Sequence, residues 1–244
     1  MSFNKVLIIS DNAYLCNEFK KIIENLSNKN YSFDFAISPF SKPKDFDNQV
    51  DIYDLKKSED IKEIISRFDL IFSIHCKQIF PIELVENVKC INIHPGYNPI
   101  NRGWYPQVFS IIHDLPIGAT IHEIDNKLDH GPIIAREFVE KYDYDTSESL
   151  YNRILAKEVD LLNKYLPQIL ENTYSVVMPE NEGNIYLKKD FNDLLKIDLD
   201  KNYSAGELID KLRALTHGSY SNAYFLDRKT GEKIFVGINL KKDE

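Results

Sequence analysis

Cysteine is scarce in this chain, with three among 244 residues. Cys16, Cys76 and Cys90 are odd in number and lack the close spacing of metal-site cysteines. Such a set is typical of reduced thiols in a cytoplasmic protein. We therefore expect a cytoplasmic location and no metal site built on cysteine.

Long apolar runs are also absent from the sequence. A membrane-spanning helix needs roughly 18 or more apolar residues, and no stretch approaches that length. After Met1–Lys5 the chain enters an apolar strand of about five residues, which is too short for a signal-peptide core. We expect no membrane partner.

Positive charge is not in excess. The chain has 30 Lys and Arg against 38 Asp and Glu, a formal net charge of −8 and a pI near 5.3. A dedicated nucleic-acid-binding protein needs a basic surface that releases counterions, so we expect no nucleic-acid partner. The 43% hydrophobic and 28% charged composition is that of a soluble globular protein.

Strands and helices alternate along the first part of the chain. The apolar stretches Val6–Ile9 and Asp69–Ile74 are typical of parallel strands covered on both faces. Apolar residues at helical spacing from Thr146 to about Leu170 indicate a long helix packed on the sheet. This order predicts an α/β fold with a Rossmann-like, mostly parallel sheet.

The pattern changes from Thr173 onward, where short strands, a capped helix and two alternating stretches follow one another. The alternation about Arg228–Glu232 is typical of a β-hairpin. We therefore predict a larger α/β domain over residues 1–172 and a small C-terminal α+β appendage over 173–244, ending in the hairpin. Apolar residues along the hairpin predict a homodimer interface: Tyr224, Ile234, Val236 and Ile238.

Two polar side chains stand at the end of a predicted strand over Val88–Ile93. Alternation at a period of two residues places Asn92 and His94 on the same face of this strand. Pro95 and Gly96 end the strand sharply, where open α/β sheets place their ligands. An amide and an imidazole are therefore expected at a cleft.

A carboxylate reaches the same cleft if a second strand, Gly118–Ile124, is a neighbour in the sheet. That strand leads into the polar turn Asp125–Gly131, which contains Asp129. The turn lacks the alternating oxygen ligands of a calcium loop. The expected cleft then carries an amide, an imidazole and a carboxylate.

The motifs Asn92–Gly96 and Leu128–Ile134 together resemble those of the folate-dependent formyltransferase family. The intervening segment Asn98–Pro106 is similar to the branch that formylates nucleotide-linked amino sugars, such as dTDP-4-amino-4,6-dideoxyglucose. The close match covers roughly Asp69–Glu140. The resemblance makes residues 1–172 the catalytic domain and 173–244 a substrate-binding and dimerisation region.

The resemblance implies transfer of a formyl group from N10-formyltetrahydrofolate to the amine of a dTDP-linked amino-deoxysugar. The amine would stand on C3 or C4, and the product would serve surface polysaccharide synthesis of the O-antigen type. It gives Asn92, His94 and Asp129 the catalytic roles. His94 suits a base or, when charged, an oxyanion donor, Asn92 suits the oxyanion, and Asp129 would hold the imidazole.

The binding residues are also expectations. The resemblance implies that the cofactor lies against the loop after Asp69–Ile74 and the turn Asp125–Gly131, with these contacts: Gln78, Ile79, Phe80, Asp125 and Leu128. A guanidinium fork suits a pyrophosphate, and aromatic faces suit a sugar or a pyrimidine. The expected contacts of the sugar nucleotide are accordingly Asn12, Lys77, Asn98, Asn101, Arg102, Trp104, Tyr220, Asn222 and Tyr224.

Several of these side chains have an alternative role. Asn12 also fits a helix cap, Lys77 a solvated cation, and Phe80 and Trp104 plain core packing. A metal site on His94, Asp129 and His130 lacks a compact ligand motif, so we expect no metal. Three further histidines are expected to be structural: His75, His113 and His122.

Four other functions stay open on the sequence alone. Glycinamide ribonucleotide formyltransferase and methionyl-tRNA formyltransferase share the cofactor, but the second would bring a longer basic C-terminal domain. A formyltetrahydrofolate hydrolase would use water as the acceptor. A non-catalytic nucleotide-sugar binding protein would keep the three polar residues without turnover.

Overall fold

The computed structural model describes residues 2–27, 30–46 and 50–243. Its centre is a seven-stranded sheet with the strand order β3-β2-β1-β4-β5-β7-β8. These strands are β1 (Lys5–Ser10), β2 (Ser32–Ile37), β3 (Asp51–Ile52), β4 (Leu70–Ile74), β5 (Lys89–His94), β7 (Gly118–Glu123) and β8 (Ile133–Phe138).

The sheet is mostly parallel, which confirms the predicted α/β class. Strands β3, β2, β1, β4 and β5 pair in parallel, whereas β7 and β8 are antiparallel to their neighbours. Val6 and Ile8 face one core cluster and Leu7 and Ile9 the other, all fully buried. Because both faces are covered, the strand needs the continuous apolar run that its sequence supplies.

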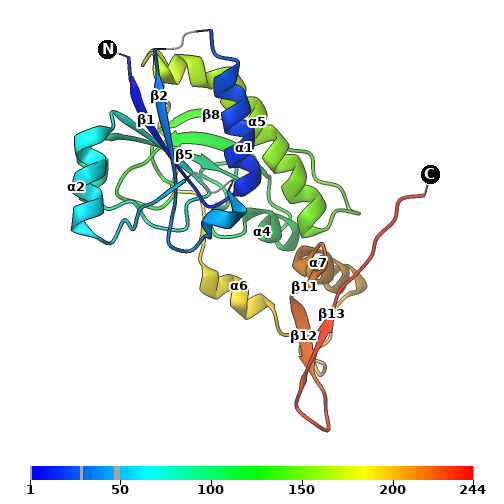
Figure 1. Ribbon diagram of the computed structural model, residues 1–244. Helices are drawn as coiled ribbons and strands as arrows, with labels where there is room; N and C mark the ends of the chain where they lie inside the picture. The colour runs from blue at the N-terminus through cyan, green and yellow to red at the C-terminus, as the bar shows by residue number, and fades with distance from the viewer. Residues whose placement is uncertain (1, 28–29, 47–49, 244) are drawn as a thin grey trace.

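Helices form a layer on each face of the sheet (Figure 1). The dark-blue α1 and the lime-green α5 lie together on one side, and the cyan α2 lies on the other. The helices are α1 (Ala13–Glu24), the short 3-10 helix η1 (Pro43–Asp45), α2 (Ser58–Arg67), α3 (Ile82–Asn87), α4 (Pro106–Ile112), α5 (Ser147–Leu170), α6 (Lys188–Leu194) and α7 (Ala205–Leu215).

The C-terminal region extends away from the sheet as helices and short ribbons (Figure 1). Ser204 and Glu207 form the predicted capping box of α7, and β12 and β13 form the predicted hairpin. The region packs back through α7 against α4 and α5. Its short strands are β9 (Ile185–Tyr186), β10 (Thr216–His217), β11 (Tyr220–Ser221), β12 (Ala223–Leu226) and β13 (Lys233–Val236).

The segment after β5 contains a short strand and then a short helix. Arg102–Gly103 form strand β6, which pairs in parallel with β9. Tyr105 then has a left-handed backbone (φ 51°), and α4 begins only at Pro106. The pairing partner lies far along the chain, so the local pattern of residues does not reveal this strand.

Candidate active site

The predicted meeting of two strands holds in the structure. β5 and β7 are antiparallel neighbours, with Asn92 opposite His122 and His94 opposite Thr120. The turn after β7 folds back over the C-terminal end of β5, so that Asp129 lies beside both Asn92 and His94. The structure therefore brings the three predicted catalytic residues together.

The two edges of the His94 ring have different surroundings. Nε2 lies 3.3 Å from the carbonyl oxygen of Asn101. A Cβ at Gly96 would stand only 2.5 Å from that nitrogen, so this edge is closed off by the loop after β5. Both ring nitrogens face a group that only accepts, and of the two the Asn101 carbonyl is the nearer and is the one within hydrogen-bond geometry, so we assign the proton of the neutral ring to Nε2. The lone pair then belongs to Nδ1, which lies 3.5 Å from Asp129 Oδ2.

Asp129 is a buried carboxylate surrounded by donors. Its Oδ1 accepts from Asn92 Nδ2 at 2.9 Å and its Oδ2 accepts from the Gly103 amide at 3.0 Å. Burial by itself would raise the pKa of Asp129, but His94, His122 and the Gly103 amide outweigh burial and hold it well below its usual range. The side chain is therefore an ionised carboxylate at neutral pH.

His94 is neutral at neutral pH for the opposite reason. Burial lowers the pKa of His94 below its ordinary value of 6.5, and the attraction of Asp129 only partly offsets burial. His122 adds to the lowering. A neutral imidazole with a lone pair on Nδ1 favours the role of a base over that of a charged donor.

His122 belongs to this cluster, although the sequence suggested a merely structural histidine. Its Nδ1 lies 2.7 Å from the Glu123 carbonyl oxygen, so Nε2 of the neutral ring is an acceptor. Asn92 Nδ2 lies 3.2 Å from that Nε2 and 2.9 Å from Asp129 Oδ1. Both amide hydrogens of Asn92 are thus hydrogen-bonded, one to His122 and one to Asp129. Asn92 can donate to a substrate oxygen only if one of these two hydrogen bonds breaks.

A cleft of about 660 Å³ opens beside the three residues. This is within the range of about 300–1,000 Å³ that small-molecule sites occupy. Both parts of the chain line the cleft. The C-terminal part contributes Leu187, Phe191, Ala214, His217, Tyr220 and Asn222.

Ten of the predicted site residues line this cleft. Besides Asn92, His94 and Asp129, they are Lys77, Gln78, Ile79, Trp104, Leu128, Tyr220 and Asn222. Gln78 has its side chain committed, because Oε1 accepts from Leu55 N and Nε2 donates to Asp54 Oδ1. Only its backbone is left to face a ligand.

Two predicted cofactor contacts lie outside the cleft lining. Phe80 is 7% exposed and packs with Leu84 in the core cluster on the α2 side of the sheet. Asp125 accepts from the Lys127 amide and pairs with His130 Nδ1 at 2.6 Å. Core packing and an ion pair therefore occupy these two side chains.

Five predicted substrate contacts also lie outside the lining, because protein groups bind them. Asn12 caps α1 and donates to the Tyr151 hydroxyl, while Tyr224 packs against Phe235 in the hairpin. The other three are at most 7% exposed and support the catalytic loops: Asn98, Asn101 and Arg102. Arg102 in particular is not placed as the expected pyrophosphate clamp.

Sequence reasoning missed a second polar group at the cleft. His75 lines the cleft, where its Nε2 lies 2.9 Å from the buried Glu158 and its Nδ1 lies 3.0 Å from the Tyr151 hydroxyl. His75 directly follows β4, the strand beside β5, and this position alone could have marked it. No local signal marks Tyr151 or Glu158, which belong to the amphipathic pattern of α5.

Metal and membrane features were searched among residues 2–27, 30–46 and 50–243. In that part of the chain, no group of three or more His, Cys, Asp or Glu side chains is placed to hold a metal ion. Within the same residues no helix has the length and apolar character that crossing a membrane requires.

Known proteins share this arrangement of sheet and C-terminal region. Residues 7–166 match the family described as formyl transferase, and residues 190–242 match the N-formyltransferase dimerization C-terminal domain. The chain belongs to the formyl transferase family. The formyl transferase match includes Asn92, His94 and Asp129.

Three similar proteins place the chain within this family. The dTDP-4-amino-4,6-dideoxyglucose formyltransferase of Mycobacterium bovis is 46% identical over 77% of this chain and 80% of its own length. A 4-N formyltransferase structure from Francisella tularensis is 43% identical, with a TM-score of 0.92, over 98% of this chain and 99% of that one. A formyltransferase structure from Anoxybacillus kamchatkensis, in complex with a UDP-linked 4-formamido sugar and tetrahydrofolate, is 25% identical, with a TM-score of 0.60, over 86% of this chain and 98% of that one.

The charge on Asp129 predicts the titration of His94 in this formyltransferase. In Asp129→Asn the pKa of His94 should fall further below 6.5, because the carboxylate is the attraction that opposes burial. NMR titration of the imidazole signals, assigned with His94→Gln, measures this shift. Asp125→Asn, which removes a carboxylate of the same turn that pairs with His130 and not with His94, is the control and should leave the His94 titration unchanged. An unchanged or raised pKa of His94 in Asp129→Asn would contradict the electrostatic account.

Proposed function

We propose that this protein transfers a formyl group from N10-formyltetrahydrofolate to the amine of a dTDP-linked amino-deoxysugar, 4-amino-4,6-dideoxyglucose or its 3-amino isomer. The observation that carries the proposal is the convergence of Asn92, His94 and Asp129 on one cleft whose far wall is the C-terminal region. The relative that is 46% identical carries the name of such an activity.

The cleft suits the folate on the side of the loop after β4. Ile79 is 81% exposed there and Leu128 36% exposed, an apolar surface for a flat ring at the cleft. The Lys77 amide is fixed by Asp11 Oδ2 at 2.7 Å, and the Gln78 side chain by Leu55 and Asp54. The loop is thereby held with its backbone free to recognise ring nitrogens and oxygens.

His94 acts as the base in this proposal. When bound, N10-formyltetrahydrofolate supplies the formyl carbon and takes up the electron pair of the broken carbon–nitrogen bond. Nδ1 of His94 would remove the proton from the attacking amine, and Asp129, 3.5 Å away, would stabilise the imidazolium that results. The imidazolium would then give this proton to the nitrogen that leaves with tetrahydrofolate. The Asn101 carbonyl keeps the proton on Nε2 and the lone pair on Nδ1.

Asn92 stabilises the negative charge that develops on the formyl oxygen. It is an uncharged donor, so its hydrogen bond strengthens as the charge develops. The bond to His122, at 3.2 Å, is the longer of its two and the one we expect it to exchange.

Lys77 takes the place of Arg102 as the expected partner of the pyrophosphate. Among the described residues that line the cleft, Lys77 is the one Lys or Arg. His75 and Tyr151 line the same part of the cleft as hydrogen-bonding groups. If the pyrophosphate faces these three side chains, the amine of the sugar lies near His94.

The nucleotide base is assigned to the wall made by the C-terminal region. Tyr220 is 71% exposed at the cleft, and Trp104 and Phe191 supply further aromatic surface. Aromatic faces of this kind stack on a pyrimidine ring. The preference for thymine over uracil rests on the similar proteins, since one methyl group is worth only about 1–3 kcal/mol to a pocket.

We place the reaction in the cytoplasm and its product in surface polysaccharide synthesis. Cys16, Cys76 and Cys90 are not joined in disulfides, which fits a reducing compartment. Burial raises the pKa of Cys76 and of Cys90 to about 12, so neither is a reactive thiolate that would compete with the chemistry at His94.

The catalytic roles predict losses that are not additive. His94→Ala and Asp129→Ala should each lower kcat by about 10²–10⁴-fold, because the base is lost in one and its partner charge in the other. The double variant should be no worse than about the poorer single variant, since the two residues act as a unit. Steady-state rates with N10-formyltetrahydrofolate and the dTDP-amino sugar measure this. Asp160→Ala, a solvent-facing carboxylate on α5 that is 71% exposed, is the control and should keep the wild-type rate.

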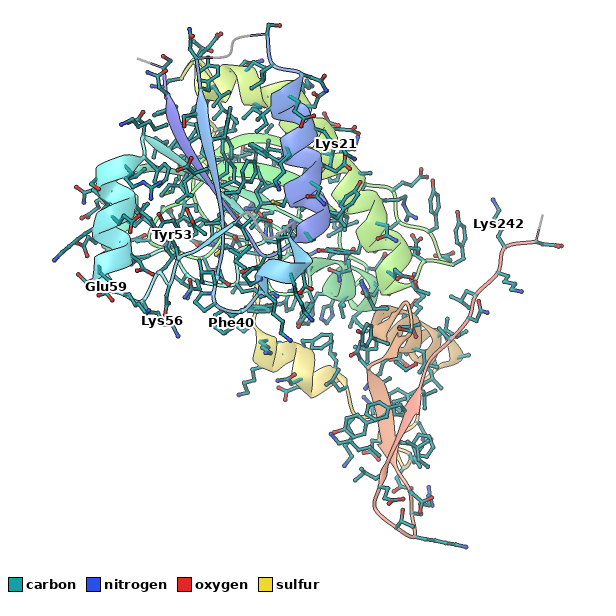
Figure 2. The ribbon with its side chains drawn as sticks, viewed as in Figure 1. Lys21, Phe40, Tyr53, Lys56, Glu59 and Lys242 are labelled. Carbon is teal, nitrogen blue, oxygen red and sulfur yellow. The ribbon has the colours of Figure 1, made fainter. Side chains whose placement is uncertain are left out.

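Binding of the nucleotide is predicted to depend on Lys77. Calorimetric titration should show dTDP binding that weakens about ten-fold or more in Lys77→Ala, because a charge-assisted bond to phosphate is lost. Lys21→Ala is the matched control, since Figure 2 labels Lys21 on α1, away from the C-terminal region. Equal affinity in Lys77→Ala, or formylation of glycinamide ribonucleotide by a protein that ignores dTDP, would refute the assignment.

We also propose that the protein forms a homodimer and that the hairpin β12–β13 is its interface. Phe235 is 59% exposed and Ile234 40% exposed, more apolar surface than so small a hairpin can hide by itself. The match to a dimerization domain spans both strands.

Sedimentation tests this interface. The wild type should sediment as a dimer at micromolar concentration, and Phe235→Asp should sediment as a monomer, because a charge would be buried without a partner. Thr230→Ala, at the exposed turn of the same hairpin, should remain dimeric. A monomeric wild type would overturn the proposed interface.

A further inference from the structure

One short segment outside both matched regions touches the loop that holds the catalytic residues. We define the linker segment as residues 181–186, which follow the formyl transferase match and precede the dimerization match. Its strand β9 pairs in parallel with β6, and Trp104 N donates to Tyr186 O at 2.8 Å. The linker segment therefore lies along the loop after β5.

Asn184 makes most of the hydrogen bonds between the linker segment and this loop. Its Oδ1 accepts from Asn101 N at 3.1 Å and its Nδ2 donates to Asn101 Oδ1 at 3.3 Å. Its backbone N donates to Pro99 O and its carbonyl accepts from Arg102 N. Asn184 thus binds three of the four residues from Pro99 to Arg102, through both its side chain and its backbone.

The loop fixed in this way has an unusual backbone. Asn101 has a left-handed φ of 60° and is fully buried, a conformation that persists only where surrounding contacts impose it. Gly183 closes the approach, because a Cβ there would lie 2.0 Å from Pro99 O. The linker segment therefore packs against the loop with no space for a side chain between them.

The loop that Asn184 holds contacts both His94 and Asp129. The Asn101 carbonyl oxygen lies 3.3 Å from His94 Nε2, and the Gly103 amide donates to Asp129 Oδ2 at 3.0 Å. The first contact favours a proton on Nε2 of His94, and the second is one of the groups that lower the pKa of Asp129. A shift of the loop would disturb both at once.

We propose that Asn184 is a positioning residue for catalysis: it holds the Asn101 carbonyl against His94 Nε2 and so presents Nδ1 to the acceptor amine. The proposal rests on the proposed function for the identity of the reaction, but the orientation of the imidazole is a property of the free protein. Asn184 itself does not line the cleft.

The test is Asn184→Ala, measured by kinetics and by NMR. The kcat of this variant should fall about ten-fold or more, because a misplacement of about 1 Å in a reacting group can reduce the rate by that factor or more. The KM for the formyl donor should stay within about two-fold of the wild-type value. The pKa of His94 should fall as well, because the Asn101 carbonyl is one of the groups that raise it. The other groups that act on His94 are Asp129 in the turn after β7, His122 on β7 and Glu158 on α5, and all three are unchanged in the variant.

Two further variants keep the test decisive. Asn184→Asp retains an acceptor for the Asn101 amide and should recover most of kcat, within about three-fold of wild type. Asn181→Ala removes a side chain of the same linker segment whose Oδ1 accepts only from Gly183 N among the contacts described, and it should match wild type. If Asn184→Ala folds poorly, Asn184→Ser takes its place in the comparison with Asn184→Asp, because the serine side chain is too short to reach the Asn101 amide.

Two results would overturn the positioning role. One is a loss of thermal stability in Asn184→Ala with kcat per folded molecule and the His94 titration unchanged, which is the behaviour of a merely structural contact. The other is a lower kcat with an unmoved His94 pKa. A wild type that transfers no formyl group would instead refute the proposed function, and the NMR titration would still test the orientation of His94.

Discussion

An ionised carboxylate that is out of contact with water must be surrounded by donors, and the active-site end of this fold is arranged around that need. Asp129 is 9% exposed in its side chain and receives bonds from Asn92 and the Gly103 amide. Removing a carboxylate from water costs several kcal/mol unless such partners are present. The loops after β5 and β7 are thus held together by the same charge that tunes His94.

The antiparallel step in the sheet decides how Asp129 reaches this site. Because β7 runs back beside β5, Glu123 at its end lies opposite Ile91, and the Ile124 amide donates to the Cys90 carbonyl. The turn between β7 and β8 then doubles back along β5 and brings Asp129 to Asn92 and His94. Residues from three places in the chain then share one buried volume.

The sequence was sufficient where a local rule applies. Period-two alternation placed Asn92 and His94 on one face of β5, and the buried runs of β1 and β4 predicted a parallel sheet. It failed where polar residues bind other parts of the chain. Asn101 and Arg102 resemble ligand contacts by residue type, yet they are buried against Asn184 and Leu128. Such pairings depend on the tertiary fold, and no short window of sequence contains both partners.

The pairing of β6 with β9 joins the formyl transferase region to a segment beyond it in the sequence. Residues 7–166 contain every side chain of the catalytic cluster, yet the backbone groups that brace their loop come from Asn184 and Tyr186. The formyl transferase match ends at residue 166, but hydrogen bonds from Asn184 and Tyr186 extend back into the matched region. A fragment cut at that boundary would keep Asn92, His94 and Asp129 and lose the hydrogen bonds from Asn184 and Tyr186 that hold the loop beside them.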